Sequence, residues 1–226
     1  MRKERIVGFL TIGQSSRKDL MPEIRSLLLP HIKVLEAGAL DGLSAEEIEN
    51  LAPGPDEAPI ITRLKGGVSV VVGKEKITSL LQQKIDNLER DGACLIALLC
   101  TAPYSGFSSN SLILLPGNLL TNFIRALELK GSIGVLVPLE KHIEFAKNRL
   151  EKLGKNLYFE SASPYGNLKD LEEAAARLSS RKGLSLILMD CLGYSLKMKQ
   201  MISPFFQVPI ILPRSLLIRT INELLE

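Results

Sequence analysis

Two cysteines end two similar segments of the chain. The run Arg90-Asp-Gly-Ala-Cys-Leu-Ile-Ala-Leu-Leu-Cys100 aligns without a gap on Arg181-Lys-Gly-Leu-Ser-Leu-Ile-Leu-Met-Asp-Cys191, with Arg, Gly, Leu, Ile and the final Cys in common. A helix followed by Gly and an apolar strand is common in α/β proteins, so the shared cysteine is the informative part. The match indicates two similar α/β halves, each with a thiol at the carboxyl end of a buried strand, where open α/β sheets bind ligands.

A pair of opposed thiols permits proton transfer without a cofactor. If the two halves face each other about a pseudo-two-fold axis, one thiolate takes a proton from a carbon beside a carboxylate and the other thiol returns one. Backbone N–H groups and hydroxyls would stabilise the charge that develops. We therefore predict that Cys100 and Cys191 are the catalytic pair. Thr101, Gly193 and Tyr194, which follow the two cysteines, are expected to contact the substrate.

A cysteine in an apolar strand is more often a small buried hydrophobe than a reactive group. That is our interpretation of Cys94, which lies within its strand. Cys100 and Cys191 differ because polar and Gly-containing residues follow them, and Gly193 allows the backbone to approach a ligand. Strand alternation directs the side chain of Asp190 away from that of Cys191, which makes Asp190 a weak candidate for a base, with the ordering of a loop as the alternative.

The end of the first strand is a second candidate for ligand binding. Thr11, Gly13, Gln14 and Arg17 lie in the run Thr-Ile-Gly-Gln-Ser-Ser-Arg-Lys-Asp. Hydroxyl and amide side chains beside a glycine suit an anion, and a guanidinium pairs with a carboxylate. The alternative is a capped loop with Arg17 on the surface and a helix that starts at Asp19. Both interpretations remain open at this point.

Short apolar runs alternate with amphipathic segments along the whole chain, which predicts an α/β fold with parallel sheets. The expected strands are Ile6–Ile12, Ala93–Leu99, Ser132–Val137, Leu184–Met189 and Pro209–Leu212. The expected helices are Asp19–Leu29, Ser44–Leu51, 77–88, Gly117–Leu129, 139–153, Leu168–Leu178 and Ser215–Leu225, and a further helix is expected soon after Cys191. A loop over 53–59 and a β-hairpin over about 60–72 interrupt this alternation.

Composition limits the classes of function. The chain has 226 residues, a net charge of +3 and 5% aromatic residues, without a dense basic block, which argues against a nucleic-acid partner. No apolar run approaches the roughly 18 residues of a membrane span. Three cysteines form neither a disulfide framework nor a CxxC metal pair, so we expect a cytoplasmic protein without a metal or cofactor. His31 and His142 are expected to be structural, and a homodimer is the assembly to test.

Three segments resemble the bacterial AroM family. They are Thr11-Ile-Gly-Gln-Ser-Ser-Arg-Lys-Asp, Asp190-Cys-Leu-Gly-Tyr and Pro209-Ile-Ile-Leu before a closing helix. AroM-like proteins are grouped with the aspartate/glutamate/hydantoin racemase superfamily, and the family name reflects an association with genes of aromatic amino acid biosynthesis. The resemblance implies two pseudo-symmetric α/β domains with parallel four-stranded sheets and an active-site cleft between them. In that superfamily a cysteine from each domain acts as acid and base, at positions that match Cys100 and Cys191.

The sequence also departs from the amino-acid racemases. In the first domain these usually carry Cys-Asn-Thr, whereas this chain has Cys100-Thr-Ala. In the second domain they often carry Cys-Thr-Glu or Cys-Thr-His, whereas this chain has Cys191-Leu-Gly. The run Cys191-Leu-Gly-Tyr is similar to the Cys-Ala-Gly-Met of hydantoin racemases. The expected function is therefore a cofactor-independent racemase or isomerase for a small carboxylate or cyclic amide. Two alternatives stay open: an isomerase or decarboxylase with one working cysteine, and a non-catalytic carboxylate sensor.

The closing segment predicts a discontinuous first domain. Apolar residues of Ser215–Glu226 form one stripe, which must be buried. From this stripe and the superfamily resemblance, we expect the first domain to comprise 1–112 and 213–226, and the second 113–212.

Overall fold

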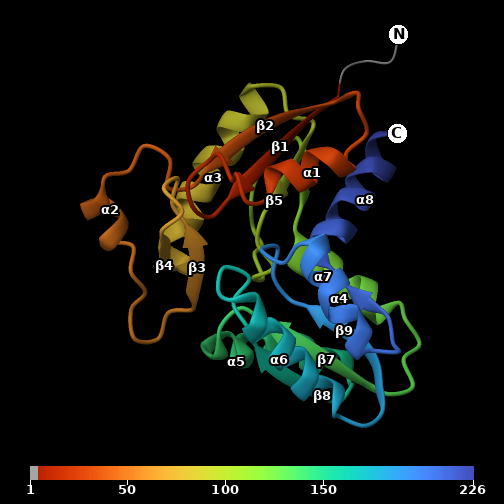
Figure 1. The fold of residues 1–226 in the computed structure, drawn as a ribbon. Coiled ribbons are helices and arrows are strands. Elements are labelled where there is room, and N and C mark those ends of the chain that lie inside the picture. Colours follow the sequence, from red (N-terminus) through yellow and green to blue (C-terminus); the bar gives the residue numbers. More distant parts are fainter. Residues whose placement is uncertain (1–4) are drawn as a thin grey trace. The chain divides into compact units, whose positions relative to one another are not determined.

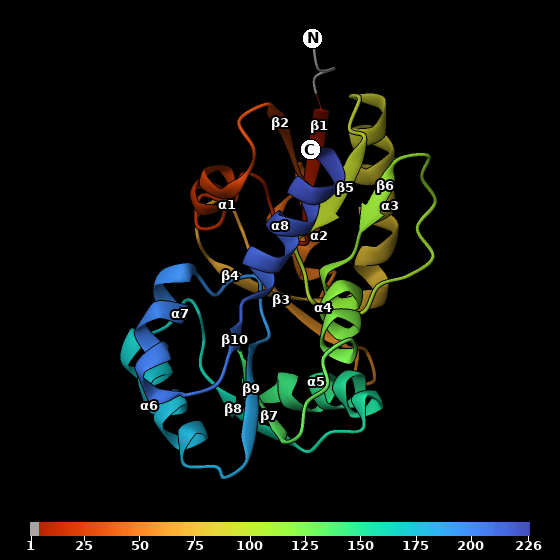
Figure 2. The same cartoon turned by 90° about the vertical axis from the view of Figure 1, so that its right-hand side faces the viewer.

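The computed structural model describes residues 5–226. The chain divides into two compact units, 5–116 together with Asn222–Glu226, and Gly117–Ile221. Figure 1 and Figure 2 together label the helices and strands of both units. Each unit has its own parallel four-stranded sheet, and the first unit also carries an antiparallel hairpin, so the predicted α/β architecture is confirmed.

The sheet of the first unit has the strand order β2-β1-β5-β6, and all its strands are parallel. The strands are β1 (Arg5–Thr11), β2 (Ile32–Gly38), β5 (Leu95–Leu98) and β6 (Leu112–Leu114). Every residue of β5 is buried, as expected for a central strand covered on both faces. Gly38 is the last residue of β2, and the carboxyl ends of β1 and β5 lead into the segments around Gly13 and Cys100.

One face of this sheet packs against the long helix α3 (Lys74–Arg90). Its residues Ile77, Leu81, Ile85 and Leu88 recur at helical spacing and are buried in one cluster with residues of β1 and β5. The other helices of the unit are α1 (Met21–Leu27) and α2 (Ala45–Glu49), and the hairpin strands are β3 (Pro59–Arg63) and β4 (Ser69–Gly73). Helix α1 begins two residues later than predicted, with a proline in its first turn.

The sheet of the second unit has the order β10-β9-β7-β8 and is also parallel. Its strands are β7 (Ser132–Val137), β8 (Leu157–Ser161), β9 (Leu184–Met189) and β10 (Ile210–Ile211). Alternate residues of β7 and β9 face two different core clusters, one with α6 (Leu168–Ser179) and one with α4 (Pro116–Arg125) and α5 (Ile143–Leu150). Figure 2 shows α5 and α6 on opposite sides of these strands.

The remaining elements of the second unit are α7 (Leu196–Ile202) and three short 3-10 helices, Glu140–His142, Glu151–Leu153 and Ser203–Phe205. The closing helix α8 (Pro213–Leu225) begins in the second unit and ends in the first. In its last turn, the side chain of Asn222 donates to the carbonyl of Leu27 at 2.9 Å and accepts from the amide of Leu29 at 3.1 Å. These bonds tie the end of α8 to the segment between α1 and β2.

Candidate active site

Cys100 follows the carboxyl end of β5 in the first unit. The backbone N–H of Ala102 donates to the Sγ atom of Cys100, with 3.4 Å between nitrogen and sulfur. The side chain is half-buried. A hydrogen bond from a backbone amide favours the thiolate over the thiol, because the negatively charged sulfur is the better acceptor.

A tyrosine that was not among the predicted site residues lies close to Cys100. Tyr104 is only 3% exposed, and within residues 5–226 its hydroxyl has no hydrogen-bond partner. Burial, with smaller contributions from Cys100 and Glu75, raises the pKa of Tyr104 far above its usual value, so its hydroxyl keeps its proton. The ammonium of Lys74, at the start of α3, lies 5.6 Å from the centre of the tyrosine ring.

The loop after β1 holds Thr11 and Arg17 in an internal network. The guanidinium of Arg17 donates to the hydroxyl of Thr11 at 3.0 Å and to both carboxylate oxygens of Asp19 at 2.9 and 2.7 Å. Arg17 is only 6% exposed, so of the two interpretations left open, the one that places Arg17 on the surface is wrong. Burial alone would raise the pKa of Asp19, but the hydrogen bonds and charge of Arg17 outweigh burial and lower it. Binding of a substrate carboxylate by Arg17 or Thr11 stays a prediction.

Gly13 and Gln14 fasten the hairpin to the end of the sheet. A Cβ atom on Gly13 would lie 2.0 Å from the carbonyl oxygen of Arg63 in β3, so only glycine fits there. The backbone N–H of Gln14 donates to that carbonyl at 3.1 Å. The side chain of Gln14 donates to the carbonyl of Leu40 at 3.3 Å and accepts from the amide of Lys65 at 3.0 Å. These contacts give both residues a structural role, beside which ligand binding stays a prediction.

Asp41 was missed by the sequence analysis. Its carboxylate accepts from the amide of Ser15 at 2.7 Å, from the hydroxyl of Ser15 at 2.6 Å and from the amide of Gly38 at 2.7 Å. It therefore joins the ends of β1 and β2. Ser15 and Asp41 are 26 residues apart, so no motif spacing indicated the contact.

Cys191 follows the carboxyl end of β9 in the second unit. The backbone N–H of Gly193 donates to its Sγ atom at 3.3 Å, the same relation that joins Ala102 to Cys100. A Cβ atom on Gly193 would lie 2.7 Å from the hydroxyl oxygen of Tyr165 and 2.8 Å from Cγ of Pro164, both of which follow β8. The internal match seen in the sequence thus extends to the hydrogen bond at each sulfur.

A buried arginine holds the turn that follows Cys191. Arg214, in the first turn of α8, is 1% exposed. Its Nε and Nη2 atoms donate to the carbonyl oxygen of Leu192 at 3.0 and 2.8 Å, and Nη2 also donates to the carbonyl of Gly193 at 3.1 Å. Arg214 was not among the residues predicted for the site. An arginine in the first turn of an apolar helix was the only signal, and it did not reveal the partner.

Tyr194 lies inside the second unit. Its ring is fully buried, and its hydroxyl donates to the carbonyl of Ala162 at 2.7 Å. Burial, followed by the nearby Cys191, Asp190 and Tyr165, raises the pKa of Tyr194 well above its usual value. The hydroxyl connects the turn after β9 with the end of β8, and direct contact of Tyr194 with a substrate stays a prediction.

Asp190 and Arg149 form a buried ion pair immediately before Cys191. The guanidinium of Arg149 also donates to the hydroxyl of Thr121 at 3.3 Å and to the carbonyl of Gly117 at 3.5 Å, which joins α5 to α4. His142 lies close enough for the charge of Asp190 to affect it, but burial and then Lys141 dominate and lower the pKa of His142.

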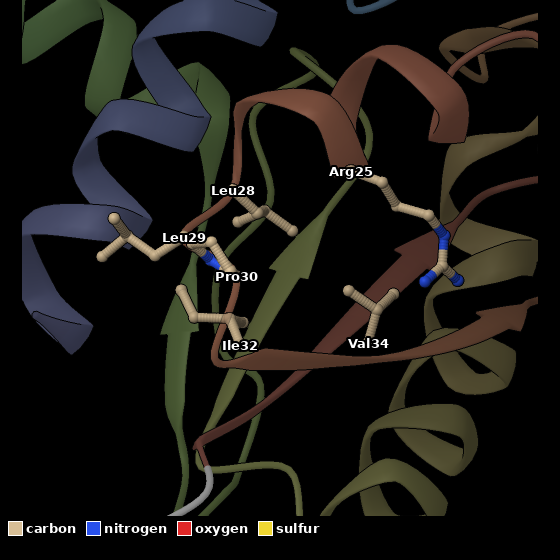
Figure 3. A pocket seen from close by; sticks show the side chains of 6 residues that line it. All are labelled: Arg25, Leu28, Leu29, Pro30, Ile32 and Val34. Carbon is tan, nitrogen blue, oxygen red and sulfur yellow. The ribbon is translucent and has the colours of Figure 1, made fainter. Parts of the chain in front are cut away.

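Within residues 5–226, no group of three or more His, Cys, Asp or Glu side chains is placed to hold a metal ion. No helix in that part of the chain combines the length and apolar character needed to cross a bilayer. A small cavity of about 190 Å³ is lined by Arg25, Leu28, Leu29, Pro30, Ile32 and Val34 (Figure 3). It lies over the amino-terminal half of β2, whereas Cys100 follows the carboxyl end of β5, so we assign this cavity no part in the thiol chemistry.

Comparison with protein families decides the classification. The profile of the AroM family, described as AroM protein, matches residues 7–225. The chain belongs to the AroM family. No match was found among curated protein sequences.

Solved structures similar to this AroM-family chain share its fold at low sequence identity. An unliganded arylmalonate decarboxylase has a TM-score of 0.64 and 13% sequence identity to this chain. The alignment covers 98% of this chain and 92% of the decarboxylase chain. An aspartate racemase homologue from Pyrococcus horikoshii OT3 has a TM-score of 0.61, 15% identity and coverages of 98% and 99%. The maleate isomerase Iso from Pseudomonas putida S16 has a TM-score of 0.64, 13% identity and coverages of 98% and 93%. The racemase-like fold is thereby established.

Proposed function

We propose that this AroM-family protein is a cofactor-independent enzyme of the racemase or isomerase type, which moves a proton at the carbon beside a carboxylate or cyclic amide carbonyl. Cys100 and Cys191 act on the same substrate carbon, one as thiolate base and the other as thiol acid. The observation that carries the proposal is the repeated hydrogen bond at sulfur. In each unit, the N–H two residues after the cysteine donates to Sγ, at 3.4 Å for Cys100 and 3.3 Å for Cys191.

This arrangement suits proton transfer because a backbone N–H that donates to sulfur favours the thiolate, which is the form that acts as a base. The thiolate removes the proton, and the electron pair of the broken C–H bond moves onto the neighbouring carbonyl or carboxylate. The second cysteine then gives its S–H proton to the opposite face of the carbon. The stereocentre is inverted and the two sulfurs have exchanged protonation states. No electrons are gained or lost, so the step needs no redox partner.

The substrate-binding roles follow from the ends of the strands. Backbone N–H groups of the turns after Cys100 and Cys191, together with the hydroxyl of Thr101, stabilise the negative charge that develops on the substrate oxygen. Gly193 lets that backbone approach the substrate. Thr11, Gly13, Gln14, Arg17 and Tyr194 complete the proposed site, and their hydrogen bonds within the protein mean that they act largely by fixing these loops.

The test is exchange of substrate hydrogen with deuterated water. The purified protein is incubated in deuterium oxide with amino acids, hydroxy acids, hydantoins and shikimate-pathway acids, and mass spectrometry follows deuterium at the carbon next to the carbonyl. We expect exchange for at least one compound, and its loss by more than a hundredfold in both Cys100→Ser and Cys191→Ser. Cys94→Ser is the matched control and should keep the wild-type rate.

Three outcomes separate the alternatives. Exchange that survives in both Cys100→Ser and Cys191→Ser would exclude the thiol pair. Loss only in Cys191→Ser would favour an isomerase or decarboxylase with one working cysteine. Thermal stabilisation by a carboxylate without any exchange would identify a non-catalytic sensor. A cytoplasmic location and a homodimer belong to the same proposal, and size-exclusion chromatography with light scattering tests the dimer.

A further inference from the structure

A single peptide group connects the buried guanidinium of Arg214 with the sulfur of Cys191. The carbonyl oxygen of Leu192 accepts two hydrogen bonds from Arg214, at 3.0 and 2.8 Å. The N–H at the other end of that same peptide group, which belongs to Gly193, donates to Cys191 Sγ at 3.3 Å. Because a peptide group is planar and trans, fixing its oxygen on one side fixes the direction of its N–H on the other.

The burial of Arg214 calls for an explanation. A guanidinium stays charged at every pH that proteins experience, and its transfer from water into the interior is costly unless hydrogen bonds replace the lost hydration. Arg214 is 1% exposed, and three of its hydrogen bonds go to two consecutive carbonyls directly after Cys191. An apolar side chain would fill the same position in α8 without this cost, so the charge is best explained by what it does to the turn.

We propose that Arg214 is a positioning residue for Cys191: it orients and polarises the Leu192–Gly193 peptide group so that its N–H stabilises the thiolate. Hydrogen bonds in series strengthen one another, because a carbonyl that accepts from a cation leaves its N–H a better donor. The planar fork of arginine matches the two carbonyls in a way that lysine does not. The inference rests on the proposed function only in taking Cys191 as the reactive thiol.

Other charged and titratable groups also face Cys191. Asp190, its neighbour on β9, disfavours a thiolate, but the ion pair with Arg149 on α5 compensates that charge. Tyr194, in the turn after β9, lies near the sulfur, and its raised pKa and its hydrogen bond to the carbonyl of Ala162 keep it a neutral phenol. The hydroxyl of Tyr165, after β8, lies beside Gly193. Arg214 on α8 reaches the peptide group beside the sulfur through the carbonyl of Leu192.

The test is the pH dependence of thiol alkylation, which needs no substrate. Iodoacetamide is added from pH 5 to 10 to the wild type and to three variants, Arg214→Gln, Arg214→Lys and Arg219→Gln. Mass spectrometry of peptides gives separate alkylation rates for Cys191 and Cys100. Arg219 is the matched control, an exposed arginine on the same helix. We expect Arg214→Gln to raise the midpoint of Cys191 alkylation by about one pH unit, which slows alkylation at neutral pH by up to about tenfold. Arg214→Lys should give a smaller rise, and Cys100 should keep its midpoint.

A role of Arg214 in packing alone would give a different result. Looser packing changes the accessibility of the sulfur, which changes the rate at all pH values but leaves the midpoint in place. An unchanged Cys191 midpoint in folded Arg214→Gln, or equal shifts at Cys191 and Cys100, would overturn the inference.

NMR of the wild type provides a second test, because Arg214→Gln is at risk of misfolding. The amide signal of Gly193 should titrate with the Cys191 midpoint, and a Gly193 signal that does not respond would also overturn the inference. A Cys191 midpoint that depends on Arg214 in a protein without any exchange activity would leave this inference intact while the proposed function fails.

Discussion

Asp190 forms a buried ion pair with Arg149, with side-chain exposures of 6% and 10%. The pair lies at the end of β9, one residue before Cys191, and connects this strand end to α5. From the sequence, Asp190 was a weak candidate for a base, with the ordering of a loop as the alternative. The partner it orders proves to be a helix, 41 residues earlier in the chain.

The first prediction concerns this pair. Asp190→Leu should lower the free energy of unfolding by about 3–5 kcal/mol, because it leaves the charge of Arg149 buried without its carboxylate. The double variant Asp190→Leu/Arg149→Met should recover much of that loss. Urea unfolding measures both values. Glu160→Ala is the control, since its partner Arg177 is 54% exposed, and should cost less than about 1 kcal/mol. Equal losses in the single and double variants would contradict the prediction.

The second prediction concerns the turn after Cys191. Gly193→Ala places a methyl group against Pro164 and Tyr165, at 2.8 and 2.7 Å, so the turn must shift. We expect a loss of about 1–3 kcal/mol and slower alkylation of Cys191, because the amide of residue 193 moves away from the sulfur. Gly54→Ala, where the added methyl group meets no atom within 4 Å, should have little effect on either quantity. Wild-type alkylation in Gly193→Ala would show that the amide does not activate the thiol.

The third prediction compares two buried tyrosines. Tyr194→Phe should cost about 1–2 kcal/mol, because it leaves the carbonyl of Ala162 without the donor that lies 2.7 Å away. Tyr104→Phe should leave stability unchanged or raise it, since within residues 5–226 the hydroxyl of Tyr104 has no hydrogen-bond partner. Thermal and urea unfolding of the two variants provide the comparison. A similar loss in both would show that Tyr104 donates a hydrogen bond in solution.

The fourth prediction concerns acid sensitivity at His142. Burial, followed by the charge of Lys141, lowers the pKa of His142 in the folded protein below its usual value. Its contribution to stability is therefore complete above pH 6.5 and is lost as the pH falls through the lowered pKa, because the unfolded chain takes up the proton first. His142→Gln should unfold with a smaller pH dependence between about pH 5 and 7. The wild type serves as the reference, and a pH profile of His142→Gln identical to that of the wild type would contradict the prediction.

All four central strands of the two parallel sheets were predicted from the sequence. The strands of these sheets that were missed lie at sheet edges. β1, β5, β7 and β9 are central and almost wholly buried, so they read as continuous apolar runs. β2, β6 and β8 lie at sheet edges and are largely half-exposed. Polar residues interrupt the apolar pattern in β2 and β8, whereas β6 is apolar but only three residues long. The fourth edge strand, β10, was found because its residues are apolar despite partial exposure.

The candidate site divides in a similar way. Cys100 and Cys191 stood out because the chain repeats the pattern that leads to each of them. Arg214, Asp41 and Arg149 did not, because their partners lie 22, 26 and 41 residues away and only the fold brings them together. The same limit applies to Arg17, whose burial depends on a contact with Thr11 that residue types alone did not distinguish from exposure at the surface.

The bonds between Asn222 and the segment after α1 bear on synthesis of the protein. They join residues 193 and 195 positions apart, and Asn222–Glu226 belong to the first compact unit. On the ribosome, these residues emerge only after all of Gly117–Ile221 has been made. The first unit therefore lacks its last residues while the second unit is translated and is able to fold. The unit whose synthesis begins first is completed last.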